Sequence, residues 1–487
     1  MLLDPVVCRQ AILAKDARFD GRFFTGVTST GIYCRPVCPA RPPKAENCRY
    51  YPTAAAAQAA GFRPCLRCRP ETAPGQGAWR GASNTVSRGM ALIDSGAMDE
   101  AGVDRLADRL GVGERQLRRL FLRHLGASPI AVAQTRRVLI AKQLIHETDL
   151  PMAEIALAAG FGSVRRFNET MRALFGRAPT ELRRSLGRGA PAEAGITLSL
   201  GYRPPFDWEA LLQFLALRAI PGVERIEDRV YRRTIEMDGA VGTLAVADQP
   251  ERNRLRVTIR FPHLSALPRI IARVRQMFDL DADPEAIGQA LSRDRRLAPL
   301  VAARPGLRTP GAWDGFELAV RAILGQQITV TAATKVAGTI AARWGEPIEM
   351  DGLTRLFPHA GVLAKAVIGG MPGSRASSIS RLAEKVSADP GLFERGPDLA
   401  ATISKLRALP GIGEWTAQYI AMRALREPDA FPAADIGLMR AMDDGHGRPS
   451  PAELLAASQA WRPWRAYAAL HLWTAPNLKE TSRAIAA

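Results

Sequence analysis

The chain has 487 residues, of which 47% are hydrophobic and 23% charged, so it is too long for one core and fits a globular protein of three or four domains. No segment approaches about 20 uninterrupted apolar residues, and the first residues, MLLDP, lack the parts of a secretion signal, so we exclude a membrane span and expect a cytoplasmic protein. Residues 1–190 hold 29 Lys and Arg against 16 Asp and Glu, which favours a polyanionic partner such as nucleic acid, although a solvated basic surface has the same charge.

Two stretches rich in Pro, Gly and Ala, residues 70–82 and 186–195, are typical of linkers, and a weaker boundary lies near residue 300. Apolar residues recur at three- and four-residue steps over 83–185 and again over 314–474, which predicts helices. Alternating segments predict antiparallel strands at 231–237, 242–247 and 254–261. We therefore predict a multidomain, mainly α protein with α+β parts.

All six cysteines lie in the first 68 residues, and four of them form two close pairs, Cys34 with Cys38 and Cys65 with Cys68. In a reducing compartment such clusters indicate metal or thiol chemistry, and two pairs can bind one tetrahedral zinc. The spacing fits a structural zinc ribbon as well as a reactive zinc-thiolate site. The absence of cysteine beyond residue 68 excludes a cysteine-ligated iron–sulfur cluster and a cysteine nucleophile in the C-terminal half.

The runs around these pairs, TGIYCRPVCPARPP and AAGFRPCLRCRPE, closely resemble the N-terminal domain of the bacterial adaptive-response (Ada) regulator family over roughly residues 4–72. The resemblance implies one zinc ion, structural and reactive, and a methyl group transferred from a methylated DNA phosphate to Cys34. The implied zinc ligands are Cys34, Cys38, Cys65 and Cys68.

Zinc keeps a thiol deprotonated and nucleophilic at neutral pH. Methylation of one thiolate makes the cluster less negative, so the cluster repels DNA phosphate less. We expect neighbouring arginines to contact the DNA backbone, unless they form only a solvated basic face. These arginines are Arg35, Arg63, Arg67 and Arg69, whereas Cys8 and Cys48 have no place in the motif.

Residues 103–124 have the pattern of a helix-turn-helix, in which a short helix ends at Gly111 and a basic helix follows. A second such unit spans 151–175. Paired units joined by a helix resemble the AraC-type DNA-binding domain, and the ending FGRAPTELRR supports this; the alternative is a helical bundle with exposed arginines. The side chains expected to reach base edges and phosphates include Arg115, Gln116, Arg119, Arg165 and Arg166.

The run LPGIGEWTA at 409–417 contains two glycines that permit a tight turn before a helix, and such turn amides can bind phosphate. A plain helix–helix turn is the alternative. Asp435 follows Trp415 by 20 residues, and a hairpin with an aspartate at this distance resembles the helix-hairpin-helix glycosylase superfamily. Asp435 aligns with its catalytic aspartate, although a lone aspartate here would otherwise be a helix N-cap. The predicted DNA contacts are Gly411, Gly413 and Thr416, and the hairpin is a candidate site for a monovalent cation.

Three longer phrases look like the 3-methyladenine DNA glycosylase II (AlkA-type) family over residues 198–475: GYRPPFDWEALLQFLALRAIPGVE, RPGLRTPGAWDGFELAVRAILGQQI and WRPWRAYAALHLW. Electron-rich rings attract a cationic alkylated purine by up to about 2 kcal/mol. A cationic base is already a good leaving group, so the reaction mainly needs a carboxylate near the sugar. The resemblance implies a base pocket lined by Phe214, Trp415, Tyr419 and Trp473, although aromatic residues more often form a core.

Two positions refine this prediction. Relatives that also cut the DNA backbone carry a lysine where this chain has Trp415, so we predict a monofunctional glycosylase. Gln327 lies where a relative has an apolar wedge, so it either fills the gap left by a flipped nucleotide or is a surface amide.

The predicted domains are a four-cysteine zinc domain (1–75), an AraC-type double helix-turn-helix domain (83–186), an α+β glycosylase N-terminal domain (196–300) and an all-α helix-hairpin-helix domain (301–487). We expect a glycosylase for 3-methyladenine-type bases fused to a methylphosphotriester-sensing transcriptional activator. Its partners would be damaged and promoter DNA and RNA polymerase, in the bacterial nucleoid. The alternative is a methylation-triggered transcription factor whose C-terminal half only binds DNA.

Overall fold

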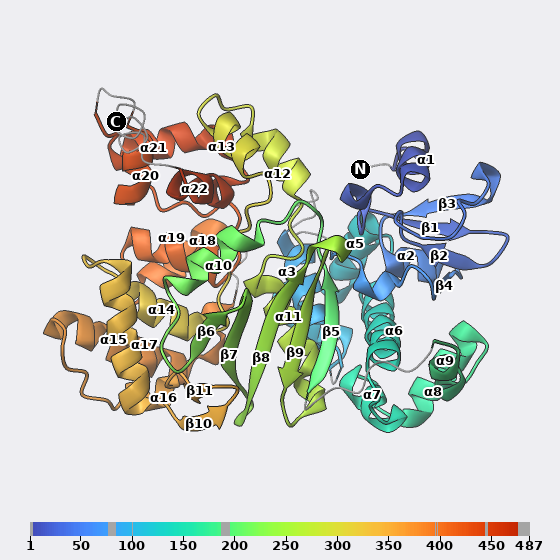
Figure 1. Cartoon of the computed structure of the whole chain (residues 1–487), viewed down its shortest axis with the longest axis horizontal. Coiled ribbons are helices and arrows are strands. Elements are labelled where there is room, and N and C mark those ends of the chain that lie inside the picture. Colours follow the sequence, from blue (N-terminus) through green and yellow to red (C-terminus); the bar gives the residue numbers. More distant parts are fainter. Residues whose placement is uncertain are drawn as a thin grey trace. The chain divides into compact units, whose positions relative to one another are not determined.

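The computed structural model describes residues 3–75, 84–99, 101–186, 195–394, 396, 398–443 and 447–475. The chain divides into two compact units (Figure 1). Unit 1 comprises Met1–Pro204, Ile235–Arg275 and Leu280–Ala282, and unit 2 comprises Pro205–Thr234, Gln276–Asp279 and Asp283–Ala487. Residues 76–83 and 187–194, most of the two predicted linkers, lie outside the described residues. Over the described ranges, no helix has the length and hydropathy needed to cross a membrane.

Unit 1 begins with a small sheet of strand order β3-β1-β2-β4, in which β2 and β4 are parallel. Its core is aromatic and includes Phe24, Tyr33 and Phe62. Gly26 in β1 is required because a Cβ there would lie 2.8 Å from the Phe62 ring. The sequence pattern predicts none of these strands, because segments this short do not show an alternation. The elements are α1 (Pro5–Ala14), β1 (Phe24–Val27), β2 (Ile32–Cys34), β3 (Cys48–Tyr51), α2 (Ala54–Ala59) and β4 (Arg63–Pro64).

Helices α3–α9 follow, and they include the two predicted helix pairs, α4–α5 and α7–α8, joined by α6. Gly111 ends α4 in the left-handed conformation, with φ 69°, as the sequence predicts. Leu117, Phe121 and Leu125 form the buried stripe of α5. The bounds are α3 (Asn84–Asp94), α4 (Val103–Leu110), α5 (Glu114–Leu125), α6 (Pro129–Glu147), α7 (Met152–Ala158), α8 (Val164–Phe175) and α9 (Pro179–Leu186).

A five-stranded sheet has the order β5-β9-β8-β7-β6, and the division between the units falls within β7. The three predicted strands are confirmed as β7, β8 and β9, and β8 and β9 are antiparallel as expected. The sequence pattern does not predict β5 or β6. The bounds are β5 (Ile196–Gly201), α10 (Trp208–Ala216), β6 (Glu224–Glu227), β7 (Val230–Met237), β8 (Ala240–Gln249), β9 (Arg254–Arg260) and α11 (Leu267–Met277).

The rest of unit 2 is mainly helical and packs around α14, whose apolar residues are buried on all sides. A short β10–β11 hairpin turns at Asp351 and Gly352, which both have positive φ. The bounds are α12 (Pro284–Leu291), α13 (Leu297–Ala303), α14 (Gly315–Leu324), α15 (Val330–Trp344), β10 (Pro347–Met350), β11 (Leu353–Arg355), α16 (Ala360–Leu363), α17 (Gly373–Ala388), α18 (Leu399–Arg407), α19 (Glu414–Arg423), α20 (Ile436–Ala441), α21 (Pro451–Ala457) and α22 (Arg465–Trp473).

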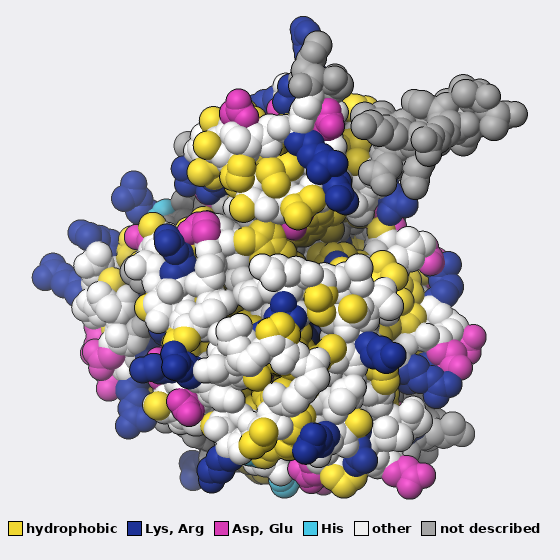
Figure 2. All heavy atoms as spheres, turned by 90° about the vertical axis from the view of Figure 1, so that its left-hand side faces the viewer, with side chains coloured by type: hydrophobic (Ala, Val, Ile, Leu, Met, Phe, Trp, Pro, Cys, Tyr) yellow, Lys and Arg dark blue, Asp and Glu magenta, His cyan; other side chains and the backbone are white. Residues whose placement is uncertain are grey.

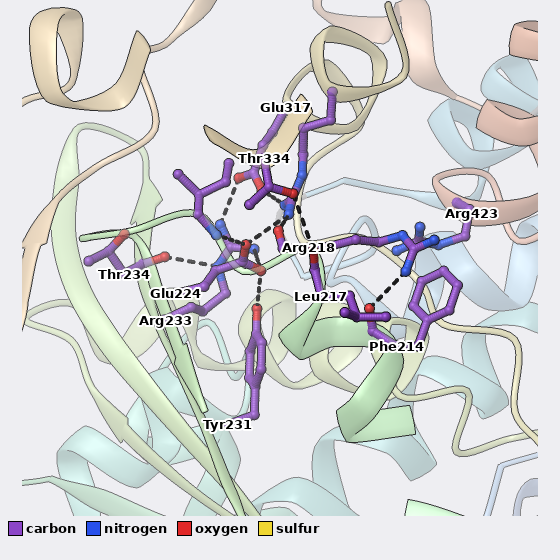
Figure 3. A network of polar contacts seen from close by, with 12 residues as sticks. Phe214, Leu217, Arg218, Glu224, Tyr231, Arg233, Thr234, Glu317, Thr334 and Arg423 are labelled. Carbon is purple, nitrogen blue, oxygen red and sulfur yellow. Dashed lines mark hydrogen bonds and ion pairs between the residues drawn. The ribbon is translucent and has the colours of Figure 1, made fainter. Parts of the chain in front are cut away.

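One face of unit 2 carries Lys and Arg side chains across its surface, and hydrophobic side chains gather around a hollow in its upper half (Figure 2). A buried ionic network lies inside the same unit (Figure 3). Arg233 pairs with Glu317 at 2.7 Å, and Arg321 pairs with Glu224 at 3.0 Å. Arg321 also donates to the main-chain oxygen of Arg218, so the network positions the chain just after α10.

Candidate functional site

The predicted hairpin connects α18 and α19. Gly411 has φ 78°, and a Cβ on it would lie 2.3 Å from Ser378 Oγ, so glycine is required here by both conformation and space. Gly413 is the N-cap of α19 and has open space around its Cα. Because the first N–H groups of a helix have no intrahelical partner, the hairpin presents backbone donors beside the positive end of the helix dipole.

Asp435 is held by three donors. Trp415 Nε1 donates to its Oδ2 at 2.9 Å, Trp473 Nε1 donates to its Oδ1 at 2.9 Å, and the Leu438 N–H donates to Oδ1 at 3.0 Å. The last contact makes Asp435 the N-cap of α20. The two interpretations that the sequence leaves open, a helix cap and a functional carboxylate held among aromatic rings, are therefore compatible. The half-buried carboxylate is fixed in orientation and keeps lone pairs for a further partner.

The predicted aromatic residues gather in unit 2 around this carboxylate. The Trp415 and Tyr419 rings stack, with centroids 5.2 Å apart and an interplanar angle of 8°. Tyr419 and Trp473 meet edge to face at 6.4 Å. Phe214 is linked to this group through Arg423, whose guanidinium lies over both Phe214 and Tyr419. All four rings are half-buried rather than enclosed in the core.

Residues that sequence reasoning missed surround this group. Arg423 Nη1 donates to the Tyr419 hydroxyl at 2.5 Å. Burial raises the pKa of the Tyr419 hydroxyl, but the positive charges of Arg423 and Arg218 outweigh burial, so that pKa falls below its ordinary value. Gln326 Nε2 donates to Gly411 O at 2.9 Å and to Thr416 Oγ1 at 3.2 Å, which ties the end of α14 to the hairpin. No periodicity or spacing in the sequence singles these residues out.

The structure separates the remaining predicted DNA contacts of this half. Gln327 is exposed and has φ 60°, a left-handed conformation that points to a functional constraint in a residue other than glycine. The Thr416 side chain, in contrast, is only 3% exposed and is bonded to Gln326. A contact from Thr416 to DNA therefore has to come from its main chain.

In unit 1 the four predicted zinc ligands come together. The sulfur atoms of Cys34, Cys38, Cys65 and Cys68 all lie within 4.8 Å of one another, and sulfurs around a tetrahedral zinc are about 3.8 Å apart, so the group fits the ion. Cys34 and Cys38 are partly exposed, whereas Cys65 and Cys68 are buried.

Backbone N–H groups distinguish the four thiols. The Arg35 N–H donates to Cys68 Sγ and the Arg67 N–H to Cys65 Sγ, each at 3.4 Å. The Ala40 N–H faces Cys38. In the described part of the chain, Cys34 Sγ accepts no backbone N–H. Because an N–H···S hydrogen bond draws electron density from sulfur, Cys34 is the least stabilised and the most nucleophilic thiolate of the group.

Two of the arginines expected to contact DNA turn inward, which corrects that expectation. Arg35 Nε donates to Asp20 Oδ1 at 2.8 Å, and its Nη1 donates to Thr72 Oγ1 at 2.7 Å. Arg69 pairs with Glu71 and with Glu147 of α6. Buried carboxylates thus use both guanidinium groups for folding, and only Arg67 of the four is fully exposed.

The predicted recognition helices are α5 and α8. Their core residues, such as Phe121 and Phe167, are buried. The predicted base- and phosphate-contacting residues are all exposed on the other face: Arg115, Gln116, Arg119, Arg165 and Arg166. Arg165 forms an exposed pair with Glu169, which is too weak to hinder another contact.

Comparison with known proteins follows the same order along the chain. Three family models match: the metal binding domain of Ada at residues 7–71, a helix-turn-helix domain at 106–185 and the AlkA N-terminal domain at 197–314. A "probable bifunctional transcriptional activator/DNA repair enzyme AlkA" of Mycobacterium tuberculosis is 43% identical over 476 residues, 96% of this chain and 95% of the relative.

Two further proteins resemble the second half. The DNA-3-methyladenine glycosylase 2 of Escherichia coli is 33% identical over 280 residues, 56% of this chain and 96% of the relative. The solved structure of the 3-methyladenine DNA-glycosylase from Archaeoglobus fulgidus has a TM-score of 0.51 at 24% identity, and the match covers 56% of this chain and 96% of that one. The second likeness shows that the fold is shared.

Proposed function

Because the chain belongs to the family of bifunctional transcriptional activator/DNA repair enzymes, we propose that its C-terminal half is a monofunctional DNA glycosylase for alkylated purines of the 3-methyladenine type. The observation that carries this proposal is the carboxylate of Asp435, fixed by Trp415 and Trp473 at 2.9 Å each beside the Tyr419 ring. The site residues keep the roles expected of them: Asp435 acts on the sugar, and Phe214, Trp415, Tyr419 and Trp473 receive the base.

The proposed reaction uses these residues as follows. The target nucleotide leaves the helix, the hairpin amides of Gly411 and Gly413 bind the DNA backbone, and Gln327 enters the gap. The aromatic rings stabilise the positive charge of the alkylated base. As the N-glycosidic bond breaks, the fixed Asp435 carboxylate stabilises the oxocarbenium-like sugar and orients water. No lysine stands at Trp415, so no Schiff base with the sugar forms at this position and the backbone stays intact.

Base release from N-methylated duplex DNA tests this proposal. The full chain should release methylated purines and leave abasic sites uncut, and borohydride should trap no covalent complex. Strand cleavage at these sites would contradict the monofunctional assignment. Absence of release, with binding to abasic-site DNA retained, would favour the alternative of a C-terminal half that only binds DNA.

We further propose that the N-terminal half senses methylphosphotriesters through Cys34 and activates transcription through α5 and α8. Cys34 is partly exposed, and its sulfur is the one without a backbone donor, which suits a methyl acceptor. Bound zinc would hold the four thiolates and keep Cys34 nucleophilic. Labelled methyl should move from methylphosphotriester DNA to the wild-type chain and to Cys48→Ala, whose sulfur lies outside the cluster, but not to Cys34→Ala.

The finer predictions extend this proposal. The four domains would keep the boundaries 1–75, 83–186, 196–300 and 301–487, and the regulator would contact RNA polymerase at a promoter in the bacterial nucleoid. A monovalent cation at the hairpin would be bound by main-chain carbonyl groups. Gly411 O already accepts from Gln326, so the neighbouring carbonyls would serve. Affinity for abasic-site DNA in potassium against choline buffers of equal ionic strength tests the cation.

A further inference from the structure

Arg423 is the last residue of α19 and lies one turn after Tyr419. Its guanidinium is buried, at 4% exposure, and every part of it is engaged. Nη1 donates to the Tyr419 hydroxyl at 2.5 Å, Nη2 donates to Gly311 O at 3.0 Å, and Nε donates to Pro310 O. The loop before α14 therefore fixes the guanidinium, and the guanidinium in turn fixes the Tyr419 ring.

The same guanidinium reaches the other side chain of the proposed base pocket. Arg423 Cζ lies 4.7 Å from the centroid of the Phe214 ring and 5.4 Å from that of Tyr419. Arg218 Cζ lies 3.7 Å from the Phe214 ring, and its Nη1 donates to Phe214 O at 3.0 Å. Figure 3 shows the Arg218 and Arg423 side chains together beside this ring. Phe214 and Tyr419 are about 200 residues apart in the sequence, and Arg423 contacts both.

The charge of Arg423 sets it apart from other buried arginines of unit 2. Arg233 is paired with Glu317, and Arg465 is paired with Asp429. Arg423 has no carboxylate within ion-pair distance among the described residues, and the charged groups nearest to it are Tyr419, Arg218 and Arg321. Burial lowers the pKa of Arg423 to about 10, and Arg218 and Arg321 add to the decrease although Tyr419 opposes it. A buried cation without a counter-ion lowers fold stability, so a role in the site explains it better than a role in folding.

We propose that Arg423 is a positioning residue of the glycosylase site, which holds the Tyr419 and Phe214 rings where they receive the flipped base. This inference rests on the proposed function of that site. Arg423 acts through the Tyr419 hydroxyl and through the face of the Phe214 ring, without touching DNA. Since a shift of about 1 Å in a positioned group can lower a rate about 100-fold, loss of the guanidinium should slow base release strongly.

A double-mutant cycle with Tyr419→Phe tests the proposal, with the rate of base release measured at saturating enzyme. Arg423→Met should lower this rate about 10- to 100-fold, with affinity for abasic-site DNA changed less than about twofold. Arg423→Lys keeps a charged donor and should recover part of the rate. In the Tyr419→Phe background, Arg423→Met should cost at most about fivefold, because the hydroxyl that it holds is already absent.

Arg426→Met is the matched control. Arg426 also lies at the end of α19, pairs with Asp279 at 2.5 Å and donates to Thr309 O, so its loss perturbs folding without touching either ring. Its rate per folded molecule should equal that of the wild type. If Arg423→Met does not fold, Arg423→Lys replaces it in the same cycle.

Two results would overturn the proposal: an Arg423 variant that releases base at the wild-type rate, or a loss of equal size with and without the Tyr419 hydroxyl. Failure of the wild-type chain to release any base is a different result, because it rejects the proposed glycosylase function itself.

Discussion

Trp415 and Asp435 are 20 residues apart in the sequence and are joined by a hydrogen bond of 2.9 Å from the indole Nε1 to the carboxylate Oδ2. The bond connects the helix that follows the hairpin, α19, to the N-cap of α20. The position that carries a lysine in backbone-cutting relatives thus has a different task here, which is to orient the carboxylate. Trp473 repeats this contact from α22.

Loss of either indole donor should reduce base release. A hydrogen bond to a charged group contributes about 1.5–3 kcal/mol, so Trp415→Phe and Trp473→Phe should each lower the rate constant roughly tenfold or more. Single-turnover kinetics measure this. Trp344→Phe removes an indole that packs against the core of unit 2 away from Asp435, and its rate should be unchanged. Equal rates for all three variants would show that the indoles only fill space.

The two hairpin glycines should respond differently to alanine. Gly411→Ala forces a side chain into the left-handed region and against Ser378, so it should lower the free energy of unfolding by about 1–3 kcal/mol. At Gly413 a Cβ meets no atom within 4 Å, so Gly413→Ala should leave stability nearly unchanged and weaken DNA binding by crowding the phosphate. Urea unfolding and binding to abasic-site DNA separate the two effects. Equal stability of both variants would contradict the conformational argument.

The stability of unit 2 should depend on pH through His471. Burial lowers the pKa of this 5% exposed side chain to about 4, whereas an unfolded histidine titrates near 6.5. The unfolded chain therefore binds the proton first, so stability is complete above pH 6.5 and falls by about 3 kcal/mol as the pH drops to 4.

Urea unfolding followed by tryptophan fluorescence tests this, because seven of the eight tryptophans lie in unit 2. His471→Gln should reduce the loss of stability between pH 6.5 and 4. An unchanged pH dependence would assign that loss to other groups.

Zinc removal should unfold the first part of unit 1, because the metal connects Cys34 in β2 to the segment after β4. Binding of structural zinc in small domains supplies much of the folding free energy. Chelation should abolish the hydrogen-exchange protection of residues 24–51, and Cys65→Ser should bind no zinc. Cys48→Ser should retain one zinc per chain. Protection that survives chelation would show that the aromatic core suffices.

Elements and residues with a local signal could be predicted from the sequence. Gly111 ends α4 as expected, and the alternating segment at 254–261 forms β9, because helix caps and alternation depend on neighbouring residues. The zinc cluster was predictable for the same reason, since its ligands occur as two close pairs. Trp415 and Asp435 were found because both belong to one short run of sequence.

Interactions between distant segments left no such signal. Arg423 looks like any basic residue at a helix C-terminus, and only the fold places it over Phe214. Arg35 lies in a run rich in Arg and Pro that suggests a DNA contact, yet Asp20 is close enough in space to pair with it. Strands such as β5 and β6 take their pairing from partners that are 30 or more residues away or too short to alternate.

The most direct test of the central claim compares base release by the wild-type chain and by Asp435→Asn. Asparagine caps a helix about as well as aspartate, so α20 should persist and the thermal unfolding midpoint should change little. The charge that stabilises the sugar is lost, so release of methylated purines should fall by about 100-fold or more while binding to abasic-site DNA remains. Release at the wild-type rate from folded Asp435→Asn would contradict the assignment of Asp435 as the catalytic carboxylate.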